Sequence, residues 1–253
     1  MFKNIEIIIR TAGEKILSYY DKISKVEVSI KNDNSPVTKA DLESEKIIVS
    51  MLKNISDFPV LTEENPILYD ITKSWNKYWL VDPLDGTKDF LDKNDEFTIN
   101  IALIQNQEPI FGAVYAPALD LLYTAQKNNG SYKNNKKIFN NSKRKKLIGA
   151  DSRYHSTNET TDFLNKFNID EVKKVGSALK LCYLAEGKID VYPRFNGTKE
   201  WDTAASHIIC NEAGCKIVDI ESKGELLYNK ESILNNFFIA SRNDLFFVED
   251  DIL

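Results

Sequence analysis

One segment limits the structure of this chain more than any other. Residues 79–90 read WLVDPLDGTKDF, so an apolar strand ends in two aspartates, Asp82 and Asp85, followed by glycine and threonine. Two carboxylates about 4 Å apart repel each other by about 4 kcal/mol at an effective dielectric constant of about 20. Taken alone, the segment also fits a type I turn with aspartate in its first position. It indicates either a solvated turn or a site that holds cations.

Three further segments place acidic residues at the end of an expected strand or the start of an expected helix. VLTEEN contains Glu63 and Glu64, SPVTKAD contains Asp41, and TKEWDTAASH contains Asp202. Each has a purely structural interpretation: solvated loop charges, a capping box with Thr38, or a favourable helix dipole. Strand ends and helix starts of a layered α/β protein commonly converge on one crevice, however. Together the segments therefore predict an acidic site.

The scarcity of nitrogen and sulfur ligands indicates which metal such a site would bind. The chain has only two histidines, and its three cysteines show no CxxC spacing, which argues against zinc and against a disulfide scaffold. Oxygen ligands favour magnesium, calcium or manganese. Two ions about 3.5–4 Å apart would stabilise both the attacking and the leaving oxygen of an in-line displacement. We therefore expect a magnesium site.

The residues that follow the aspartate pair suggest a reaction at phosphate. Gly86 allows close approach of a phosphate to the backbone, and the N–H groups after it would bind phosphate oxygens. A Thr87 hydroxyl hydrogen-bonded to Asp41 would orient an attacking water and help to deprotonate it.

Hydrophobic periodicity predicts an α+β or α/β protein with two domains, residues 1–145 and 146–253. The first half combines helices with an antiparallel meander, whereas strands and helices alternate in the second half. The polar stretch 133–146 marks the boundary. The expected helices cover residues 2–20, 42–55, 159–167, 178–186 and 201–214; the expected strands cover 26–31, 58–61, 78–82, 97–104, 110–116, 121–125, 147–150, 172–176, 189–193 and 215–218.

Composition excludes several other classes of protein. Hydrophobic residues make up 42% and charged residues 28% of 253 residues, as in ordinary globular proteins. No apolar run reaches the roughly 18 residues of a spanning helix, and charges interrupt the N-terminal segment, so we expect a cytoplasmic protein. The net charge of −5 argues against nucleic-acid binding, and KRKK at 143–146 is interpreted as a solvated loop. No GxxxxGK[ST] motif of a P-loop kinase is present.

The motifs, taken in series, resemble those of a known family, the magnesium-dependent, lithium-sensitive phosphatases that include inositol monophosphatase and the bisphosphate nucleotidases. The resemblance spans nearly the whole chain and is carried by DNSPVTKAD, VLTEEN, WLVDPLDGTKDF, EFTINIALI, GAVYAP, GSALKLCYLAEG, YPRF and EWDTAASH. It is strongest to the CysQ-type 3′(2′),5′-bisphosphate nucleotidases, which convert adenosine 3′,5′-bisphosphate to AMP and phosphate. The resemblance implies a layered α/β/α/β/α sandwich, two or more Mg²⁺ ions, inhibition by Li⁺ and a link to sulfate assimilation.

The resemblance also implies roles for individual residues. Asp41 and Thr87 match the water-activating pair of the family. The implied metal ligands are Glu63, Asp82, Asp85, Asp202 and the backbone carbonyl of Leu84. The implied substrate-binding residues are Glu63, Leu84, Asp85, Gly86, Thr87, His155, Ser177, Lys180, Arg194 and Asp202.

Two positions depart from the nucleotidase pattern. Ala178 stands where a second serine is usual, and Ser206 stands where glycine is usual. The first change removes a hydroxyl near the nucleotide, and the second is expected to crowd the packing of a helix. Neither residue is an implied metal ligand, so we expect intact catalysis and altered nucleotide affinity.

Several alternatives remain open from the sequence. The metal motifs are shared with inositol and sugar monophosphatases of the same family, and an acidic cluster also suits a non-catalytic module that binds calcium or magnesium. A nucleic-acid binder built on KRKK is a more distant alternative. Peripheral association with the cytoplasmic face of the inner membrane, adenosine 3′-phosphate 5′-phosphosulfate as a second substrate, and a monomeric or homodimeric state all remain open.

Overall fold

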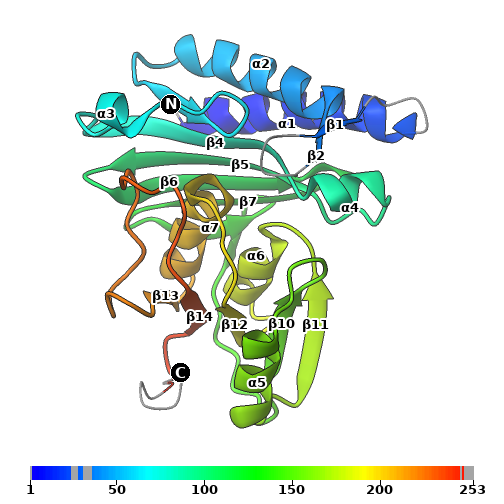
Figure 1. The fold of residues 1–253 in the computed structure, drawn as a ribbon, viewed down its shortest axis with the longest axis vertical. Coiled ribbons are helices and arrows are strands. Elements are labelled where there is room, and N and C mark those ends of the chain that lie inside the picture. Colours follow the sequence, from blue (N-terminus) through cyan, green and yellow to red (C-terminus); the bar gives the residue numbers. More distant parts are fainter. Residues whose placement is uncertain (1, 24–27, 31–35, 246, 248–253) are drawn as a thin grey trace.

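Two β-sheets organise the chain in a computed structural model that describes residues 2–23, 28–30, 36–245 and 247 (Figure 1). Within these residues the first sheet contains, in spatial order, β3 (Val60–Thr62), β4 (Lys77–Asp85), β5 (Thr98–Gln105), β6 (Glu108–Ala116), β7 (Leu121–Gln126), β8 (Gly130–Lys133) and β9 (Lys136–Ile138). The second sheet contains, in spatial order, β11 (Glu171–Val175), β10 (Ile148–Ser152), β12 (Val191–Arg194), β14 (Phe238–Arg242) and β13 (Cys215–Asp219). A small antiparallel pair is formed by β1 (Val28–Ile30) and β2 (Pro36–Thr38).

Helices cover both sheets and fill the space between them. The helices are α1 (Phe2–Tyr20), α2 (Lys39–Lys53), α3 (Tyr69–Thr72), α4 (Thr87–Leu91), α5 (Asn158–Lys166), α6 (Leu179–Ala185) and α7 (Glu200–Glu212), with a short 3₁₀ turn, η2 (Pro117–Leu119). Helices α1 and α2 pack on the outer face of the first sheet, α6 and α7 lie between the sheets, and α5 packs on the far face of the second (Figure 1). The predicted α/β/α/β/α sandwich is confirmed. None of the described helices is long and apolar enough to cross a membrane.

Strand β4 explains why the segment before the aspartate pair is apolar throughout. Trp79 and Val81 point into the core beneath α1 and α2, whereas Tyr78 and Leu80 point into the core around α6 and α7. Successive side chains of a strand alternate between faces, so a strand covered on both faces needs apolar residues at every position. Strand β4 therefore carries its acidic end to the edge of two separate cores.

Close packing of α7 on β6 requires a glycine. A Cβ added at Gly112 would lie 2.2 Å from the Ala205 carbonyl oxygen, so no other residue fits there without moving the helix. Ser206, which was expected to crowd this helix, is fully buried and donates its hydroxyl to the Thr203 carbonyl at 3.0 Å. The serine hydroxyl is thus satisfied within its own helix.

Most of the predicted elements are present, with one central omission. The first helix and the antiparallel meander are confirmed as α1 and as the β5–β6–β7 pairings. The expected strand at 26–31 is described only at 28–30, and its remaining residues lie outside the described part of the chain. Strand β14 was not predicted, although it lies between β12 and β13. It is short and buried at every position, so it carries no alternating pattern.

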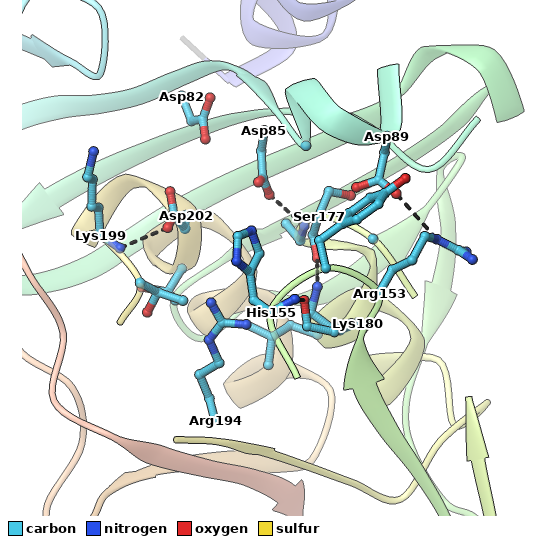
Figure 2. A pocket seen from close by; sticks show the side chains of 18 of the residues that line it. Asp82, Asp85, Asp89, Arg153, His155, Ser177, Lys180, Arg194, Lys199 and Asp202 are labelled. Atoms are coloured by element: carbon cyan, nitrogen blue, oxygen red, sulfur yellow. Dashed lines mark hydrogen bonds and ion pairs between the residues drawn. The ribbon is translucent and has the colours of Figure 1, made fainter. Parts of the chain in front are cut away.

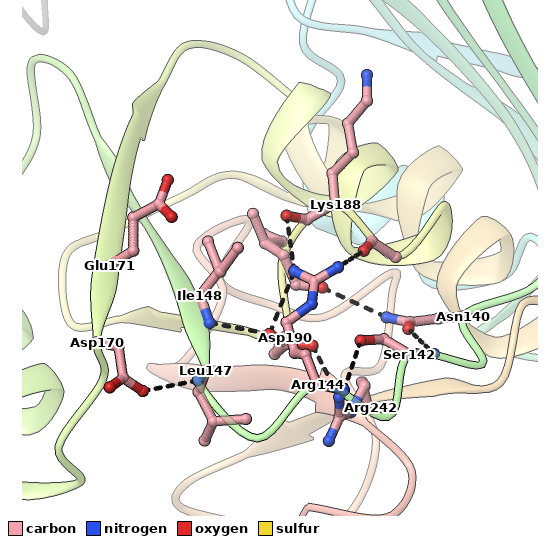
Figure 3. A network of polar contacts seen from close by, with 12 residues as sticks. Asn140, Ser142, Arg144, Leu147, Ile148, Asp170, Glu171, Lys188, Asp190 and Arg242 are labelled. Carbon is pink, nitrogen blue, oxygen red and sulfur yellow. Dashed lines mark hydrogen bonds and ion pairs between the residues drawn. The ribbon is translucent and has the colours of Figure 1, made fainter.

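A polar network surrounds the connection between the two sheets (Figure 3). Arg144 donates to the carbonyls of Gly187 and Lys188 beyond the end of α6 and lies 3.4 Å from Asp190. Asp190 is fully buried and also accepts a hydrogen bond from Arg242 at 2.9 Å. The interpretation of KRKK as a solvated loop is therefore wrong for Arg144, whose guanidinium group binds backbone carbonyls and lies beside a buried carboxylate.

Candidate metal and phosphate site

The turn at the end of β4 is bent and anchored locally. The pairing of β4 with β5 shifts register between Asp82 and Asp85, and such an irregularity redirects side chains at a strand end. The Oδ1 atom of Asp82 accepts a hydrogen bond from the Leu84 N–H at 3.0 Å. Ser44 of α2 donates its hydroxyl to the Pro83 carbonyl at 2.8 Å. The turn is thus held by its own aspartate and by the neighbouring helix.

Carboxylates from three separate segments meet at this turn. One oxygen from each of Glu63, Asp82 and Asp202 lies within 4.8 Å of the other two. Glu63 follows β3, and its N–H donates to the Val81 carbonyl at 3.1 Å, which keeps it alongside β4. Asp202 lies in the first turn of α7 and accepts a hydrogen bond from the Lys199 N–H at 2.8 Å. Parallel pairing and helix capping therefore position the two distant carboxylates.

Asp85 borders the same cluster and also contacts the second half of the chain. Its Oδ2 atom accepts a hydrogen bond from the Ala178 N–H at 2.6 Å and another from the Asn100 amide at 3.3 Å. The contact with Ala178 uses the backbone, so it does not depend on the serine missing there. Burial raises the pKa of Asp85 to about 6, even though Lys180 and Asn100 act to lower it.

Burial and mutual repulsion favour the protonated forms of the clustered carboxyls. Burial, then the charges of Glu63, Asp85 and Asp202, raise the pKa of Asp82 well above its ordinary value. Burial, then Asp85 and Glu63, raise the pKa of Asp202 to about 8. A bound cation would remove this penalty on the charged forms. The donor set, which consists of carboxylate oxygens without sulfur or imidazole, fits a hard cation such as magnesium.

The start of α2 places Asp41 beside this turn. The backbone N–H and the hydroxyl of Thr38 both donate to Oδ2 of Asp41, at 2.8 and 2.6 Å, in a capping box. The other oxygen, Oδ1, accepts a hydrogen bond from the Thr87 hydroxyl at 3.3 Å. Gly86, just before Thr87, has a φ of 85°, which glycine adopts without strain. The predicted contact between Thr87 and Asp41 is present.

A cavity of about 420 Å³ extends from the acidic cluster to the second half of the chain (Figure 2). Asp41 is 1% exposed and lies behind Thr87 rather than in the cavity wall. The remaining predicted site residues all line the cavity: Glu63, Asp82, Leu84, Asp85, Gly86, Thr87, His155, Ser177, Lys180, Arg194 and Asp202.

The end of the cavity opposite the aspartates is basic. Lys180 donates to the carbonyls of Ser177 and Val175 at 2.7 and 3.3 Å, and burial followed by Arg194 lowers its pKa to about 8. Arg194 donates to the Asn196 and Gly197 carbonyls at 2.9 and 3.1 Å. Backbone carbonyls thus fix both cations in place, and the two charges face the cavity as a prearranged pair (Figure 2).

His155 lies between the acidic and basic ends (Figure 2). Burial and the nearby positive charges of Arg194, Lys88 and Lys180 lower its pKa to about 4. The imidazole is therefore neutral near pH 7 and offers one hydrogen-bond donor and one acceptor.

Several cavity residues were not predicted from the sequence. Lys88 and Asp89 belong to the WLVDPLDGTKDF segment itself, and Arg153 and Tyr154 directly precede His155, so proximity to predicted residues was the available signal. Lys199 likewise belongs to the TKEWDTAASH segment, three positions before Asp202. Leu234 has no comparable signal, because it reaches the cavity through a loop that forms an isolated bridge with Lys199.

The fold and the acidic cavity define a class of phosphatase-like proteins. Residues 2–245 match the model of the inositol monophosphatase family, and the chain belongs to that family. The predicted resemblance is confirmed.

Individual relatives are similar over most of their length. The 3′(2′),5′-bisphosphate nucleotidase CysQ of Salmonella typhimurium is 39% identical over 242 residues, which cover 94% of this chain and 98% of the relative. The protein of the same name from Escherichia coli K12 is 40% identical and covers 92% and 96%. The crystal structure of CysQ from Bacteroides thetaiotaomicron, described as a bacterial member of this family, has a TM-score of 0.83 at 38% identity and covers 94% of this chain and 95% of its own.

Proposed function

We propose that this chain is a magnesium-dependent phosphomonoesterase that removes the 3′-phosphate of adenosine 3′,5′-bisphosphate, giving AMP and inorganic phosphate. The observation that carries the proposal is a single cavity with the clustered carboxylates of Glu63, Asp82 and Asp202 at one end and the cations Lys180 and Arg194 at the other. The names of relatives that are 39–41% identical support the same substrate.

The acidic end would hold two or more magnesium ions through Glu63, Asp82, Asp85, Asp202 and the Leu84 carbonyl. Such ions, when bound, supply positive charge that stabilises the phosphoryl oxygens as charge builds up on them. The raised pKa values of Asp82 and Asp202 support this assignment, because these buried carboxyls favour ionisation only in the presence of compensating positive charge. Lithium would inhibit by competing for the same oxygens.

Thr87 and Asp41 would prepare the attacking water. The Thr87 hydroxyl gives its hydrogen bond to Oδ1 of Asp41, so its oxygen is free to accept one from water. As the water oxygen attacks phosphorus, the bond from phosphorus to the ribose 3′ oxygen breaks, the water proton passes to the Thr87 oxygen and the threonine proton passes to Asp41. The leaving 3′ oxygen takes a proton from solvent and becomes the 3′ hydroxyl of AMP. The two hydrogen bonds from Thr38 to Oδ2 keep the Asp41 carboxylate oriented during this transfer.

The basic end would bind the phosphate that is not cleaved. Lys180 and Arg194 are already anchored by backbone carbonyls, so little side-chain order is lost when an anion binds. The neutral His155 would hydrogen-bond the sugar or the base, and Ser177 would border the nucleotide. Inositol monophosphate carries one phosphate and leaves these cations unpaired, which disfavours it as a substrate.

The biological setting follows from the substrate. We expect the reaction to occur in the cytoplasm and to remove the nucleotide bisphosphate left after sulfate assimilation. The partner is a small molecule, not a nucleic acid.

A phosphate-release panel tests the proposal directly. Adenosine 3′,5′-bisphosphate, inositol 1-phosphate and adenosine 3′-phosphate are each incubated with the protein, with magnesium or with EDTA. We expect magnesium-dependent turnover that is fastest with the bisphosphate. Preference for inositol 1-phosphate would identify an inositol phosphatase instead. Metal-dependent melting without any phosphate release would identify a non-catalytic metal-binding module.

A further inference from the structure

The loop between β11 and α6 is held from two sides. Its Gly176 N–H donates to Oε2 of Glu96 at 2.8 Å, and its Ala178 N–H donates to Oδ2 of Asp85 at 2.6 Å. Both carboxylates come from the first half of the chain. On the other side Lys180 binds the Ser177 carbonyl at 2.7 Å. The position of Ser177 in the cavity thus depends on residues from both halves.

The same Glu96 oxygen binds a second segment. Arg153 forms an ion pair with Oε2 of Glu96, the atom that also accepts the Gly176 hydrogen bond. Arg153 also donates to the Lys174 carbonyl at 3.3 Å and lies 3.4 Å from Oδ1 of Asp89 (Figure 2). One carboxylate oxygen therefore joins the strand end that leads to His155 and the loop that contains Ser177.

Packing leaves these segments little freedom to shift. A Cβ added at Gly176 would lie 2.5 Å from Oδ1 of Asp89, so this glycine is needed for the close approach. Asp89 is 3% exposed, and its Oδ1 accepts a hydrogen bond from the Asn94 amide at 2.6 Å. Asp85, Asp89 and Glu96 of the first half thus form an acidic surface, and the loop at 176–178 of the second half packs against it.

We propose that Glu96 and Arg153 are positioning residues that set the distance between the nucleotide-binding side of the cavity and its acidic side. The proposal rests on the proposed function, because it assigns His155 and Ser177 to the nucleotide. The two phosphates of the substrate are separated by a ribose of fixed length, so a small shift of these segments weakens nucleotide binding. Glu96 and Arg153 lie outside the cluster of Glu63, Asp82 and Asp202. Their substitution should therefore leave the rate unchanged for a substrate that carries only one phosphate.

Steady-state kinetics test this division of labour. Glu96→Gln and Arg153→Met should each raise the KM for adenosine 3′,5′-bisphosphate about tenfold or more, with kcat within about threefold of the unmodified protein. The kcat/KM for p-nitrophenyl phosphate, which has no second phosphate, should stay within about twofold. Arg153→Lys, which keeps the charge, should recover part of the nucleotide KM.

A matched ion pair provides the control. Glu6 and Arg10 of α1 are 3.1 Å apart; the Arg10 side chain is 33% exposed against 34% for Arg153, and the Glu6 side chain is 35% exposed against 20% for Glu96. Glu6→Gln and Arg10→Met should leave the KM and kcat for both substrates unchanged. In the double variant of Glu96→Gln and Arg153→Met, the rise in nucleotide KM should be clearly smaller than the product of the two single effects, because the two residues share one ion pair. Independent, multiplying effects would overturn the proposal, as would equal losses with both substrates.

Hydrogen exchange supplies a readout that does not need turnover. Amides of residues 171–181 should exchange faster in Glu96→Ala than in the unmodified protein, while peptides from α1 remain unchanged. Unchanged exchange at 171–181 would overturn the proposal even if the kinetics changed. If the unmodified protein released no phosphate from the bisphosphate, the proposed function would fail, whereas the exchange result would still decide whether Glu96 holds this loop.

Discussion

The Thr87 hydroxyl donates to Oδ1 of Asp41 at 3.3 Å, although the two residues are 46 positions apart in the sequence. Asp41 also completes the capping box of α2 through its other oxygen. One carboxylate therefore starts a helix with Oδ2 and faces the candidate catalytic hydroxyl with Oδ1. Substitution of Asp41 would disturb both roles, so Thr87 is the better residue with which to test the reaction.

Thr87→Val should remove the proton relay and leave the fold intact. The change keeps the shape of the side chain but deletes the hydroxyl, so kcat for the nucleotide should fall about 10²-fold or more. Thr87→Ser should retain most of the activity. Phosphate release measures both variants, and magnesium-dependent melting shows whether the metal site survives. A valine variant with full turnover would remove Thr87 from the mechanism.

Neutralising either aspartate of the turn should abolish turnover. Asp82→Asn and Asp85→Asn each remove a charge that would hold magnesium, and we expect kcat to fall by more than about 10³-fold. Asp82 is 1% exposed and repelled by its neighbours, so Asp82→Asn should also raise the melting temperature measured in EDTA. Appreciable activity in either variant would contradict the assignment of these carboxylates to the metal.

Stability without metal should decrease as the pH rises. The pKa of Asp202 is raised to about 8 and that of Asp85 to about 6, from an ordinary value of 3.8. Between the ordinary pKa of 3.8 and the raised pKa of about 8, the folded protein binds more protons than the unfolded chain. The free energy of unfolding therefore falls as the pH rises through this range. In EDTA we expect a lower melting temperature at about pH 8 than at about pH 5, with a shallower slope for Asp202→Asn.

Magnesium provides the internal check on this pH dependence. Bound ions favour the ionised carboxylates, so added magnesium should stabilise the protein more at the higher pH. A melting temperature that instead rises with pH in EDTA would contradict the shared origin of these pKa shifts.

Lys180 should give the nucleotide reaction its own dependence on pH. Burial, then Arg194, lower the pKa of Lys180 to about 8, so the free protein loses this charge above that pH. The kcat/KM for adenosine 3′,5′-bisphosphate should decline there, because this ratio reports ionisations of the free enzyme. The kcat/KM for inositol 1-phosphate should show no such decline. Lys180→Arg, which stays charged, should remove the decline for the nucleotide. If the decline in kcat/KM persisted in Lys180→Arg, another group would be responsible for the titration.

The acidic end of the site was largely predictable because short-range patterns place its residues. Asp82 and Asp85 follow an apolar strand, and Asp41 and Asp202 occupy helix starts, where carboxylates bind free N–H groups. Glu63 follows a strand that pairs in parallel with β4. Each of these positions depends on the backbone preferences of a few neighbouring residues, and the sequence displays those preferences directly.

The sequence by itself therefore determined which carboxylates reach the ends of strands and helices, and the order of most elements. Only the tertiary structure decided that the Ala178 N–H binds Asp85 across 93 positions, and that Gly176 binds Glu96 across 80. It also decided that the Lys180 ammonium group binds the Ser177 carbonyl in the loop before α6, and that β14 lies between β12 and β13 in the second sheet. These contacts depend on how two sheets pack around α6 and α7, which is a property of the whole core and not of any short segment.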